Sequence, residues 1–448
     1  MHAVIPFPEG EGFTTTKYRW LGTAAGSITG GRSMLRSLVA FVLFLLSLSA
    51  LSTSAAEEAL RVGAISPLSG PFALVGEETI KQIKGAADLV NARGGIYDGR
   101  KIEIIALDGK ANAQDSLLAL NAAIDGGIHY VVAHISSVNH ALSDAIVKHN
   151  ARNPDKRILL LNFDGRDPAL TETKCHFWHF RVNYHTDTEV NYLTDFLAQQ
   201  PSVRKVYLIN QDYAYGQAVQ RTTRELLPKK NPNIQIVGDD MVPLGKVKDF
   251  SPYAAKIRAS GADTVVTSSW GNDLFLLVRA GHESGLDVRY YIFNGNVPGT
   301  TAGVGAAGVG KVVSLFPWHE NAEPNAYQGF NAEFKTRYKS TENFDYITAH
   351  RSIAMLARAV DQARSDDPLK VAYALEGMEF NGPEGRVWMR AEDHQLIAPL
   401  YLARLTKTGE GGVKFDVENT GLGWMTVAKV EGKDAVPPIK CTVERPAM

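Results

Sequence analysis

The chain has 448 residues, which is too long for one compact hydrophobic core, so its length favours two domains. Its 47 basic and 48 acidic residues give a net charge of −1 and are interleaved along the chain. Such a balance offers no broad field to a nucleic acid or an acidic surface, and we therefore exclude nucleic-acid binding.

The N-terminal segment has the pattern of an export signal. An apolar run of about 14 residues, 38–51, is preceded by two arginines and followed by small residues. The run is too short for a transmembrane helix, and no later run is long enough to span a bilayer. We expect Met34 to be the true start, residues 1–56 to be an upstream extension plus signal peptide, and cleavage to occur near Ala56.

A strand, a loop, a helix and a second strand open the mature chain between residues 60 and 108. Residues 60–65 alternate apolar with small side chains and stop at a Ser-Pro pair, which ends a strand. Apolar residues at helical spacing follow from Glu77 and end at a Gly-Gly pair. Ligands of open α/β sheets bind in loops at the carboxyl ends of strands, so the loop 67–76 is the first candidate functional segment.

The same alternation continues and predicts a first Rossmann-like lobe. Its further elements are helix 115–124, strand 129–135, helix 141–148 and strand 157–163. The two strands end in polar or Gly-rich loops, at 136–137 and 164–168. Three successive strands thus place their loops on one rim.

A second series of similar elements predicts a second lobe. The expected elements are strand 177–182, helix 189–198, strand 205–210, helix 215–227, strand 234–242, helix 253–259, strand 264–268, helix 274–282, strands 289–293 and 311–316, helices 326–338, 344–364 and 369–375, and strands 387–389 and 400–405. The tail after Lys429 is rich in proline and is expected to be extended.

The glycine-rich segment 303–308 fits the letters of a dinucleotide-binding fingerprint. That motif requires a helix to follow it, whereas a strand is predicted next, so we interpret the segment as a surface loop. The chain shows no Ser-His-Asp elbow, no paired-carboxylate motif and no P-loop.

The chain has two cysteines, Cys175 and Cys441. In an exported protein an even pair favours a disulfide over two free thiols, and this one would fasten the tail to the body. Metal binding by Cys175, His176 and His179 is the alternative. The predicted strand 177–182 disfavours it, because the two histidines would lie on opposite faces.

Five stretches, taken in order and spacing, resemble the periplasmic leucine/isoleucine/valine-type binding proteins of ABC importers. They are VGAISPLSGPFALVGEETIKQIKGAADLVNARGGIYDGRKIEI, DGGIHYVVAHISSVNHALSD, RILLLNFDGRDPALT, NQDYAYGQAV and ASGADTVVTSSWGNDLFLLVRAGHESGL. The resemblance spans nearly the whole mature chain. It implies the α/β fold of a type I periplasmic binding protein, in which two Rossmann-like lobes with parallel central sheets are joined by a three-segment hinge and close on a ligand.

The resemblance implies that both lobes are discontinuous in sequence. Lobe one would comprise residues 57–183 and 318–383, and lobe two residues 184–317 and 384–430. Residues 431–448 would form a C-terminal tail, with both cysteines near the hinge.

The resemblance also implies a set of ligand-binding residues. In this family, hydroxyl groups and backbone N–H groups of lobe one hold the ligand carboxylate, and aromatic side chains of lobe two cover the rest of the ligand. The matching positions are Leu74 or its neighbour Val75, Ser136, Ser137, Asp164, Gly165, Arg166, Tyr215, Trp270 and Asn294, and Trp318 is a further candidate for stacking on an aromatic ligand.

Two of these positions depart from the family pattern. Asn294 stands where amino-acid binders carry an acidic residue, and an amide lacks the charge that offsets the desolvation of an ammonium. Arg166 replaces a small hydroxyl residue, and a guanidinium suits bidentate recognition of a carboxylate. Both favour an acid without an ammonium group, such as an aromatic acid stacked against Trp270, Tyr215 or Trp318. Asp164 could instead pair with an ammonium or with Arg166, which leaves an amino acid open.

The resemblance therefore implies a monomeric, cofactor-free and metal-free protein of the periplasm that delivers a small carboxylate to inner-membrane ABC permease subunits, and not an enzyme. Two other function classes stay open. One is a ligand-sensing module for a membrane receptor. The other is a secreted hydrolase, whose candidate groups by sequence proximity are His134, Ser136 and His140.

Overall fold

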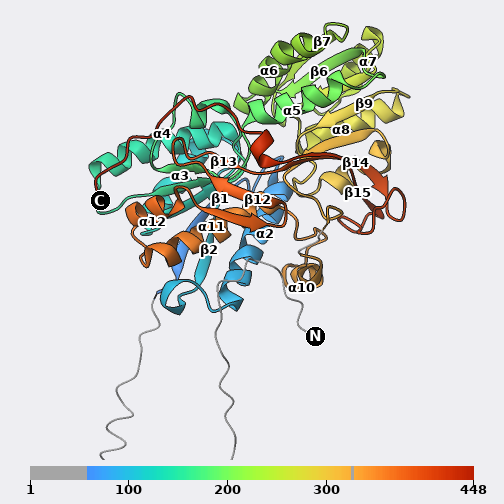
Figure 1. Cartoon of the computed structure of the whole chain (residues 1–448). Coiled ribbons are helices and arrows are strands. Elements are labelled where there is room, and N and C mark those ends of the chain that lie inside the picture. The colour runs from blue at the N-terminus through green and yellow to red at the C-terminus, as the bar shows by residue number, and fades with distance from the viewer. Residues whose placement is uncertain (1–57, 324–326) are drawn as a thin grey trace, which may run out of the picture.

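The computed structural model describes residues 58–323 and 327–448, so the predicted start and signal peptide lie outside the described residues. Two α/β lobes lie side by side, one drawn mainly in blue and teal and the other mainly in green and yellow (Figure 1). Within the described ranges, no helix is both long and apolar enough to cross a bilayer.

The first lobe is built on a parallel five-stranded sheet in the order β2-β1-β3-β4-β5. Its strands are β1 (Leu60–Ser66), β2 (Ile102–Asp108), β3 (Tyr130–Ala133), β4 (Leu159–Asn162) and β5 (His179–Arg181). Every residue of β3 and β4 is buried, as is typical of parallel strands covered on both faces.

Helices from two distant parts of the chain surround this sheet. They are α2 (Ala73–Ala92), α3 (Ala113–Asp125), α4 (Ser136–Arg152), α10 (Gln328–Tyr338), α11 (Ile347–Ala363) and α12 (Pro368–Leu375), with the short 3-10 helices η1 (Tyr97–Gly99) and η2 (Pro168–Thr171). The late helix α11 packs on α2, so the lobe is complete only with residues from the second half of the chain.

The second lobe is built on a seven-stranded sheet in the order β15-β14-β10-β9-β8-β6-β7. Its strands are β6 (Lys205–Gln211), β7 (Gln235–Val242), β8 (Thr264–Thr267), β9 (Arg289–Ile292), β10 (Val312–Phe316), β14 (Leu400–Lys407) and β15 (Leu422–Val430). Strands β6 to β10 are parallel, and β14 and β15 join the edge in antiparallel orientation. Its helices are α5 (Thr186–Ala198), α6 (Ala214–Lys230), α7 (Ser251–Ser260), α8 (Gly271–Glu283) and α9 (Thr300–Val304), with η3 (Gly305–Gly308).

In the chain, a small antiparallel sheet follows the last helix of the first lobe and precedes β14 of the second lobe. It contains β11 (Glu379–Gly382), β12 (Gly385–Met389) and β13 (Leu396–Ile397), and Arg181 of β5 bridges to Gln395 beside it. The chain then enters the seven-stranded sheet at β14, after the two-residue link 398–399. The predicted lobe boundary between 383 and 384 falls in the turn of the β11–β12 hairpin and stays a prediction.

The predicted α/β class with two parallel-dominated lobes is confirmed, with local corrections, and strands β11, β13 and β15 were not predicted. Helix α4 begins at Ser136, five residues before its predicted start at residue 141. The predicted loop 303–308 is wrong, since these residues lie in α9 and η3. A Cβ on Gly303 would lie 2.4 Å from the ring of Phe275, so this glycine serves close packing.

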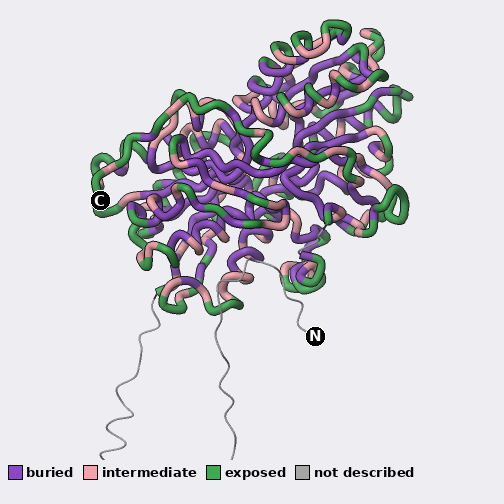
Figure 2. Tube along the Cα trace, viewed as in Figure 1, coloured by how far each residue is buried: buried purple, intermediate pink, exposed green. Residues whose placement is uncertain are grey.

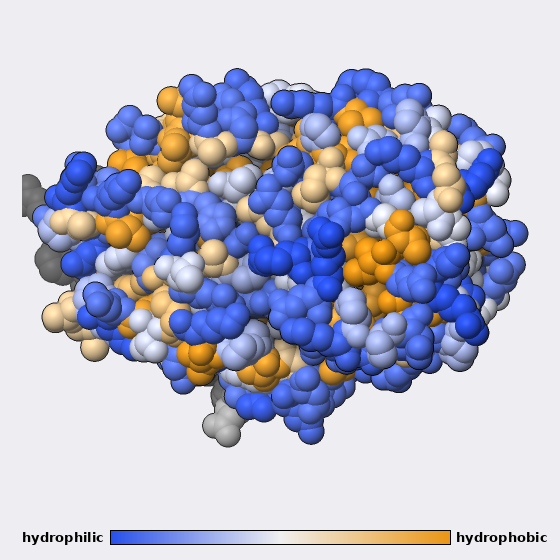
Figure 3. All heavy atoms as spheres, turned by 90° about the horizontal axis from the view of Figure 1, so that it is seen from above, coloured by the Kyte–Doolittle hydropathy of each residue, from blue (hydrophilic) through white to orange (hydrophobic). Residues whose placement is uncertain are grey.

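Burial follows the two large sheets and the contact between the lobes, whereas exposed residues follow the outer faces of the helices (Figure 2). The face seen from above is mainly hydrophilic with separate small hydrophobic patches (Figure 3).

Candidate functional site

A cavity of about 20 Å³ lies between the lobes, at the carboxyl ends of strands from both sheets. From the first lobe it is lined by Val75, His134, Ile135, Asp164, Arg166 and Tyr346, and from the second by Tyr213, Tyr215, Trp270, Asn294 and Val297. The space would hold about one water molecule, so the lobes meet closely and a larger ligand must separate them.

Larger hollows lie elsewhere, including one of about 490 Å³ between helices α5 and α6 and the C-terminal tail. The interlobe cavity is nevertheless the better candidate site. It combines buried charged groups with residues that follow β3, β4, β6, β8 and β9, where ligands of open α/β sheets bind.

Arg166 is the central polar residue of this cavity, and its side chain is only 3% exposed. It follows β4 in the first lobe, and its Nε and Nη2 lie 2.8 and 2.7 Å from Oδ1 of Asp164. Its Nη1 reaches the second lobe, where it donates to the Tyr215 hydroxyl at 3.2 Å and to the Phe293 carbonyl at 2.9 Å. The guanidinium therefore joins the two lobes.

Asp164 is fully engaged beside Arg166. Its carboxylate also accepts hydrogen bonds from the Asn183 amide at 2.5 Å and the Tyr346 hydroxyl at 2.6 Å. These partners hold the Asp164 carboxylate beside Arg166. The sequence left open whether Asp164 pairs with Arg166 or with a ligand ammonium, and in the structure it pairs with Arg166.

Glu189 is a site residue that the sequence analysis missed. It lies in the first turn of α5 in the second lobe, is 2% exposed, and accepts from Arg166 Nη1 at 3.0 Å. Burial, opposed by Arg166 and assisted by Asp164, raises the pKa of Glu189 to about 7. Burial alone would lower the pKa of Arg166, but Asp164 and Glu189 raise it well above its usual value, so Arg166 stays charged.

Aromatic side chains form the other walls of the cavity. The Trp270 indole N–H donates to the Tyr213 hydroxyl at 3.1 Å, and the Arg166 guanidinium lies 5.2 Å from the Tyr215 ring centroid. Phe72 of the first lobe packs on Trp270 with ring centroids 4.2 Å apart, which adds an apolar contact between the lobes. These walls suit a planar or branched apolar group.

Some of the predicted ligand-binding residues line the cavity and others do not. Asp164, Arg166, Tyr215, Trp270 and Asn294 line the cavity, and Val75 lines it where Leu74 is 60% exposed. The Ser136 hydroxyl accepts the backbone N–H groups of Arg166 and Asp167 at 2.9 and 3.2 Å, so it shapes the loop that carries Arg166.

Three further predicted residues lie outside the cavity lining. Ser137 is half-buried in the first turn of α4. Gly165 packs against Asn139 and Asn162, where a Cβ would lie 2.6 to 3.0 Å from their side chains. Trp318 is fully buried and packs edge-on against Tyr327.

The hydrolase candidates do not form a nucleophile–base pair. His134 Nε2 lies 2.9 Å from the Ser66 hydroxyl, and burial lowers the pKa of His134 to about 4. His140 lies 3.4 Å from Asp167. Among the described residues, neither histidine is hydrogen-bonded to Ser136.

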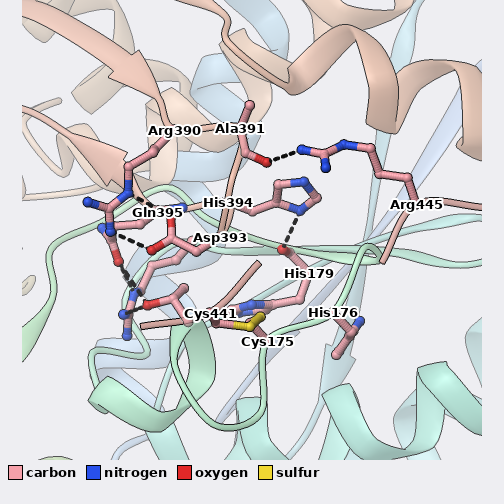
Figure 4. The surroundings of a disulfide bond; sticks show 12 residues. Cys175, His176, His179, Arg390, Ala391, Asp393, His394, Gln395, Cys441 and Arg445 are labelled. Carbon is pink, nitrogen blue, oxygen red and sulfur yellow. Dashed lines mark hydrogen bonds and ion pairs between the residues drawn. A yellow bond between two sulfur atoms is a disulfide. The ribbon is translucent and has the colours of Figure 1, made fainter. Parts of the chain in front are cut away.

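The predicted disulfide between Cys175 and Cys441 is confirmed (Figure 4). The predicted opposite placement of His176 and His179 is wrong, because β5 begins only at His179 and the two rings lie 6.0 Å apart. With Cys175 in a disulfide, these residues do not offer the thiolate that the metal alternative required.

One group in the described part of the chain has metal-ligand spacing: Glu172, His185 and Asp187. The Lys440 ammonium lies 2.9 Å from Glu172 and 3.9 Å from Asp187. A cationic side chain of the tail thus already pairs with both carboxylates.

A sequence model described as periplasmic binding protein matches residues 59–410. The chain belongs to this family. The relatives that match it are named as binding proteins, and solved structures of the same fold are named as solute-binding proteins of ABC transporters.

The Leu/Ile/Val-binding protein homolog 4 of Brucella melitensis is 27% identical over 403 residues, which cover 88% of this chain and 95% of the relative. The Leu/Ile/Val-binding protein of Escherichia coli is 22% identical, covering 73% and 85%. The closed leucine-, isoleucine-, valine-, threonine- and alanine-binding protein of Brucella ovis has a TM-score of 0.75 at 26% identity, covering 87% of this chain and 100% of that chain.

A solute-binding protein of Rhodopseudomonas palustris, solved with benzoate, has a TM-score of 0.71 at 17% identity, covering 86% of this chain and 99% of that chain. At this identity the similarity shows the shared fold alone.

Proposed function

We propose that this protein is the periplasmic substrate-binding component of an ABC importer and that it closes its two lobes on a small solute with a carboxylate group. The observation that carries the proposal is Arg166, a buried guanidinium at the interlobe cavity with donors directed into both lobes.

Closure follows from contacts that exist only when the lobes meet. Arg166 of the first lobe donates to Tyr215 and Phe293 of the second lobe. A ligand carboxylate held by Arg166 would be enclosed by the same two residues. A ligand shifts a hinge only through its higher affinity for the closed state, and contacts to both rims supply that difference.

Aromatic and amino acids both suit this site. The tyrosines and Trp270 would cover a benzoate ring as well as a branched aliphatic side chain. The Brucella ovis structure is named for five amino acids and the Rhodopseudomonas palustris structure holds benzoate, so both ligand classes occur on this fold.

A thermal-shift panel identifies the ligand class, because binding to the native state alone raises the melting temperature. The panel contains leucine, valine, benzoate, 4-hydroxybenzoate and an aliphatic acid. We expect at least one carboxylate to raise the melting temperature. The importer role is then tested by measuring the uptake of that compound in cells that lack the gene. A shift with leucine or valine and none with aromatic acids would contradict our preference for an acid without an ammonium group.

Two variants test the site with the compound that binds. Arg166→Ala should weaken binding at least 30-fold, since truncating one partner of a buried charge pair costs about 2–5 kcal/mol. Trp270→Ala should weaken it through lost packing. Arg221→Ala is the control, because Arg221 lines the larger hollow beside α6. Calorimetry that shows unchanged affinity in both cleft variants, or a loss only in Arg221→Ala, would refute the site.

A further inference from the structure

Glu189 and Asp164 place two carboxyl groups on one guanidinium inside a buried site. Glu189 is 2% exposed, Asp164 9% and Arg166 3%. With all three ionised, the group carries one excess negative charge, and water cannot screen it effectively.

The two carboxylates are not equally stabilised. Asp164 has Arg166, Asn183 and Tyr346 as hydrogen-bond partners. Glu189 has Arg166 on Oε1, while its Oε2 is buried and has no hydrogen-bond partner among the described residues. A buried carboxylate oxygen without a donor disfavours the ionised form, so Glu189 is the member of the pair that accepts a proton most readily.

A carboxylate ligand on Arg166 would be the third anion on this guanidinium. We infer that Glu189 is a specificity-determining residue that takes up one proton from solvent when the cleft binds an anionic solute, which releases Arg166 Nη1 to the ligand carboxylate. The inference rests on the proposed function, because it concerns the same cavity.

The groups that face Glu189 come from four elements. Asp164 and Arg166 lie on the loop after β4, Arg181 on β5, Tyr184 between β5 and α5, and Tyr213 and Tyr215 at the start of α6. Arg166, Arg181 and the start of α5 favour the carboxylate, whereas burial and Asp164 favour the carboxylic acid. Burial dominates, so the pKa of about 7 places the change within the physiological range.

A proton taken up on binding makes affinity depend on pH. Above pH 7, each further pH unit should weaken the binding of an anion up to tenfold, because Glu189 must first be neutralised. Glu189→Gln keeps the shape and the acceptor for Arg166 but removes the charge. Its affinity for an anion should therefore be nearly constant from pH 5.5 to 8.5 and should exceed that of the wild type at pH 8.5.

The first experiment needs no ligand. The melting temperatures of the wild type and Glu189→Gln are compared from pH 5.5 to 8.5. Because folding raises the pKa of Glu189, its contribution to stability is present at low pH and is lost as the pH rises through about 7. Relative to the wild type, the melting temperature of Glu189→Gln should rise by a few degrees between pH 5.5 and 8.5. A difference in melting temperature that stays constant with pH would overturn the inference.

The control is Asp195→Asn on the outer face of the same helix, where Asp195 is 51% exposed and pairs with Lys230. Its difference from the wild type should not change with pH. A change equal to that of Glu189→Gln would assign the effect to the helix as a whole and overturn the inference.

The second experiment uses benzoate as the probe. Titration calorimetry of the wild type in buffers of different ionisation enthalpy should show uptake of about one proton at pH 8 and none in Glu189→Gln. Uptake that is absent in the wild type, or equal in both proteins, overturns the inference. Failure of every solute in the panel to bind would instead refute the proposed function, while the ligand-free comparison would still decide where the proton resides.

Discussion

Gly165 shows how one residue without a side chain controls the position of Arg166. Its N–H donates to the Asn162 side-chain oxygen at 2.5 Å, and its carbonyl accepts from the Asn162 amide at 2.7 Å. A Cβ would lie 2.6 Å from the Asn139 amide. The loop after β4 is therefore tightly enclosed immediately before the guanidinium.

Gly165→Ala should displace this loop. Overpacking of an enclosed site costs about 1–3 kcal/mol, so we expect the urea midpoint to fall and carboxylate affinity to weaken together. Gly126→Ala is the control, because Gly126 ends α3 with a φ of −77° that alanine adopts readily. Unchanged affinity and stability in Gly165→Ala would show that the loop has room to move.

Although Tyr213 after β6 was missed, the family resemblance selected several cavity residues in the loops that follow strands. Arg166, Trp270 and Asn294 are examples. It missed Tyr346, which lies 182 residues from its partner Asp164, and Glu189, which reads as an ordinary helical residue. Their contacts depend on how the lobes meet, and no local pattern encodes that arrangement.

At the scale of elements, the C-terminal tail links the two lobes a further time. It leaves β15 at the edge of the seven-stranded sheet and returns to the first lobe, and Val443 N–H donates at 2.8 Å to the carbonyl of Glu392, which lies between β12 and β13 of the small sheet. Arg445 pairs with Glu376 at 2.9 Å, and the disulfide fixes Cys441 to Cys175 (Figure 4). The predicted extended tail is thus a fixed strap, with only the 3-10 helix η4 (Gly432–Asp434) as regular structure.

Replacing both cysteines by serine should release this strap. The disulfide closes a segment of 266 residues, and removal of a native disulfide typically costs about 2–5 kcal/mol. We expect a lower melting temperature and faster amide exchange in residues 436–448. The wild type with dithiothreitol should approach the variant, whereas dithiothreitol should not affect the variant itself. Equal melting temperatures for variant and wild type would mean that the noncovalent contacts alone hold the tail.

Element boundaries also show what sequence cannot tell. The polar start of α4 reads as a loop, yet the Asn139 side chain bonds the Ile135 carbonyl and helical structure begins at Ser136. Ile135 itself has a φ of +68°, an unusual conformation for a β-branched residue that the surrounding contacts must enforce.

At the scale of the whole molecule, a second buried carboxyl pair joins distant segments. Glu342 precedes α11 and is 5% exposed, and Glu418 lies between β14 and β15 and is 7% exposed. Glu418 accepts the backbone N–H groups of Thr301 and Ala302 at 3.3 and 2.5 Å. Burial and the neighbouring acidic groups Glu418, Asp345 and Glu78 raise the pKa of Glu342 well above its usual value, and burial also raises the pKa of Glu418.

This pair should make the compact state sensitive to pH. A raised pKa in the folded state gives stability below about pH 4.3, the ordinary glutamate value, that is lost as the pH rises. Small-angle scattering of the ligand-free protein should therefore show expansion from pH 5 to 8, reduced in Glu342→Gln. Glu323→Gln, at a site 71% exposed, is the control. A radius of gyration that does not change with pH would contradict the expectation.

The interleaving of early and late segments also sets an order of events during biosynthesis. The first lobe needs α11 to cover α2, and β10 of the second lobe needs β14 as its edge partner. The first lobe therefore cannot close before α11 and α12 have been synthesised, the second cannot close before β14 and β15 have been, and the disulfide waits for Cys441. Both lobes therefore acquire their complete cores late in the synthesis of the chain, and the first lobe cannot fold fully before most of the second has been made.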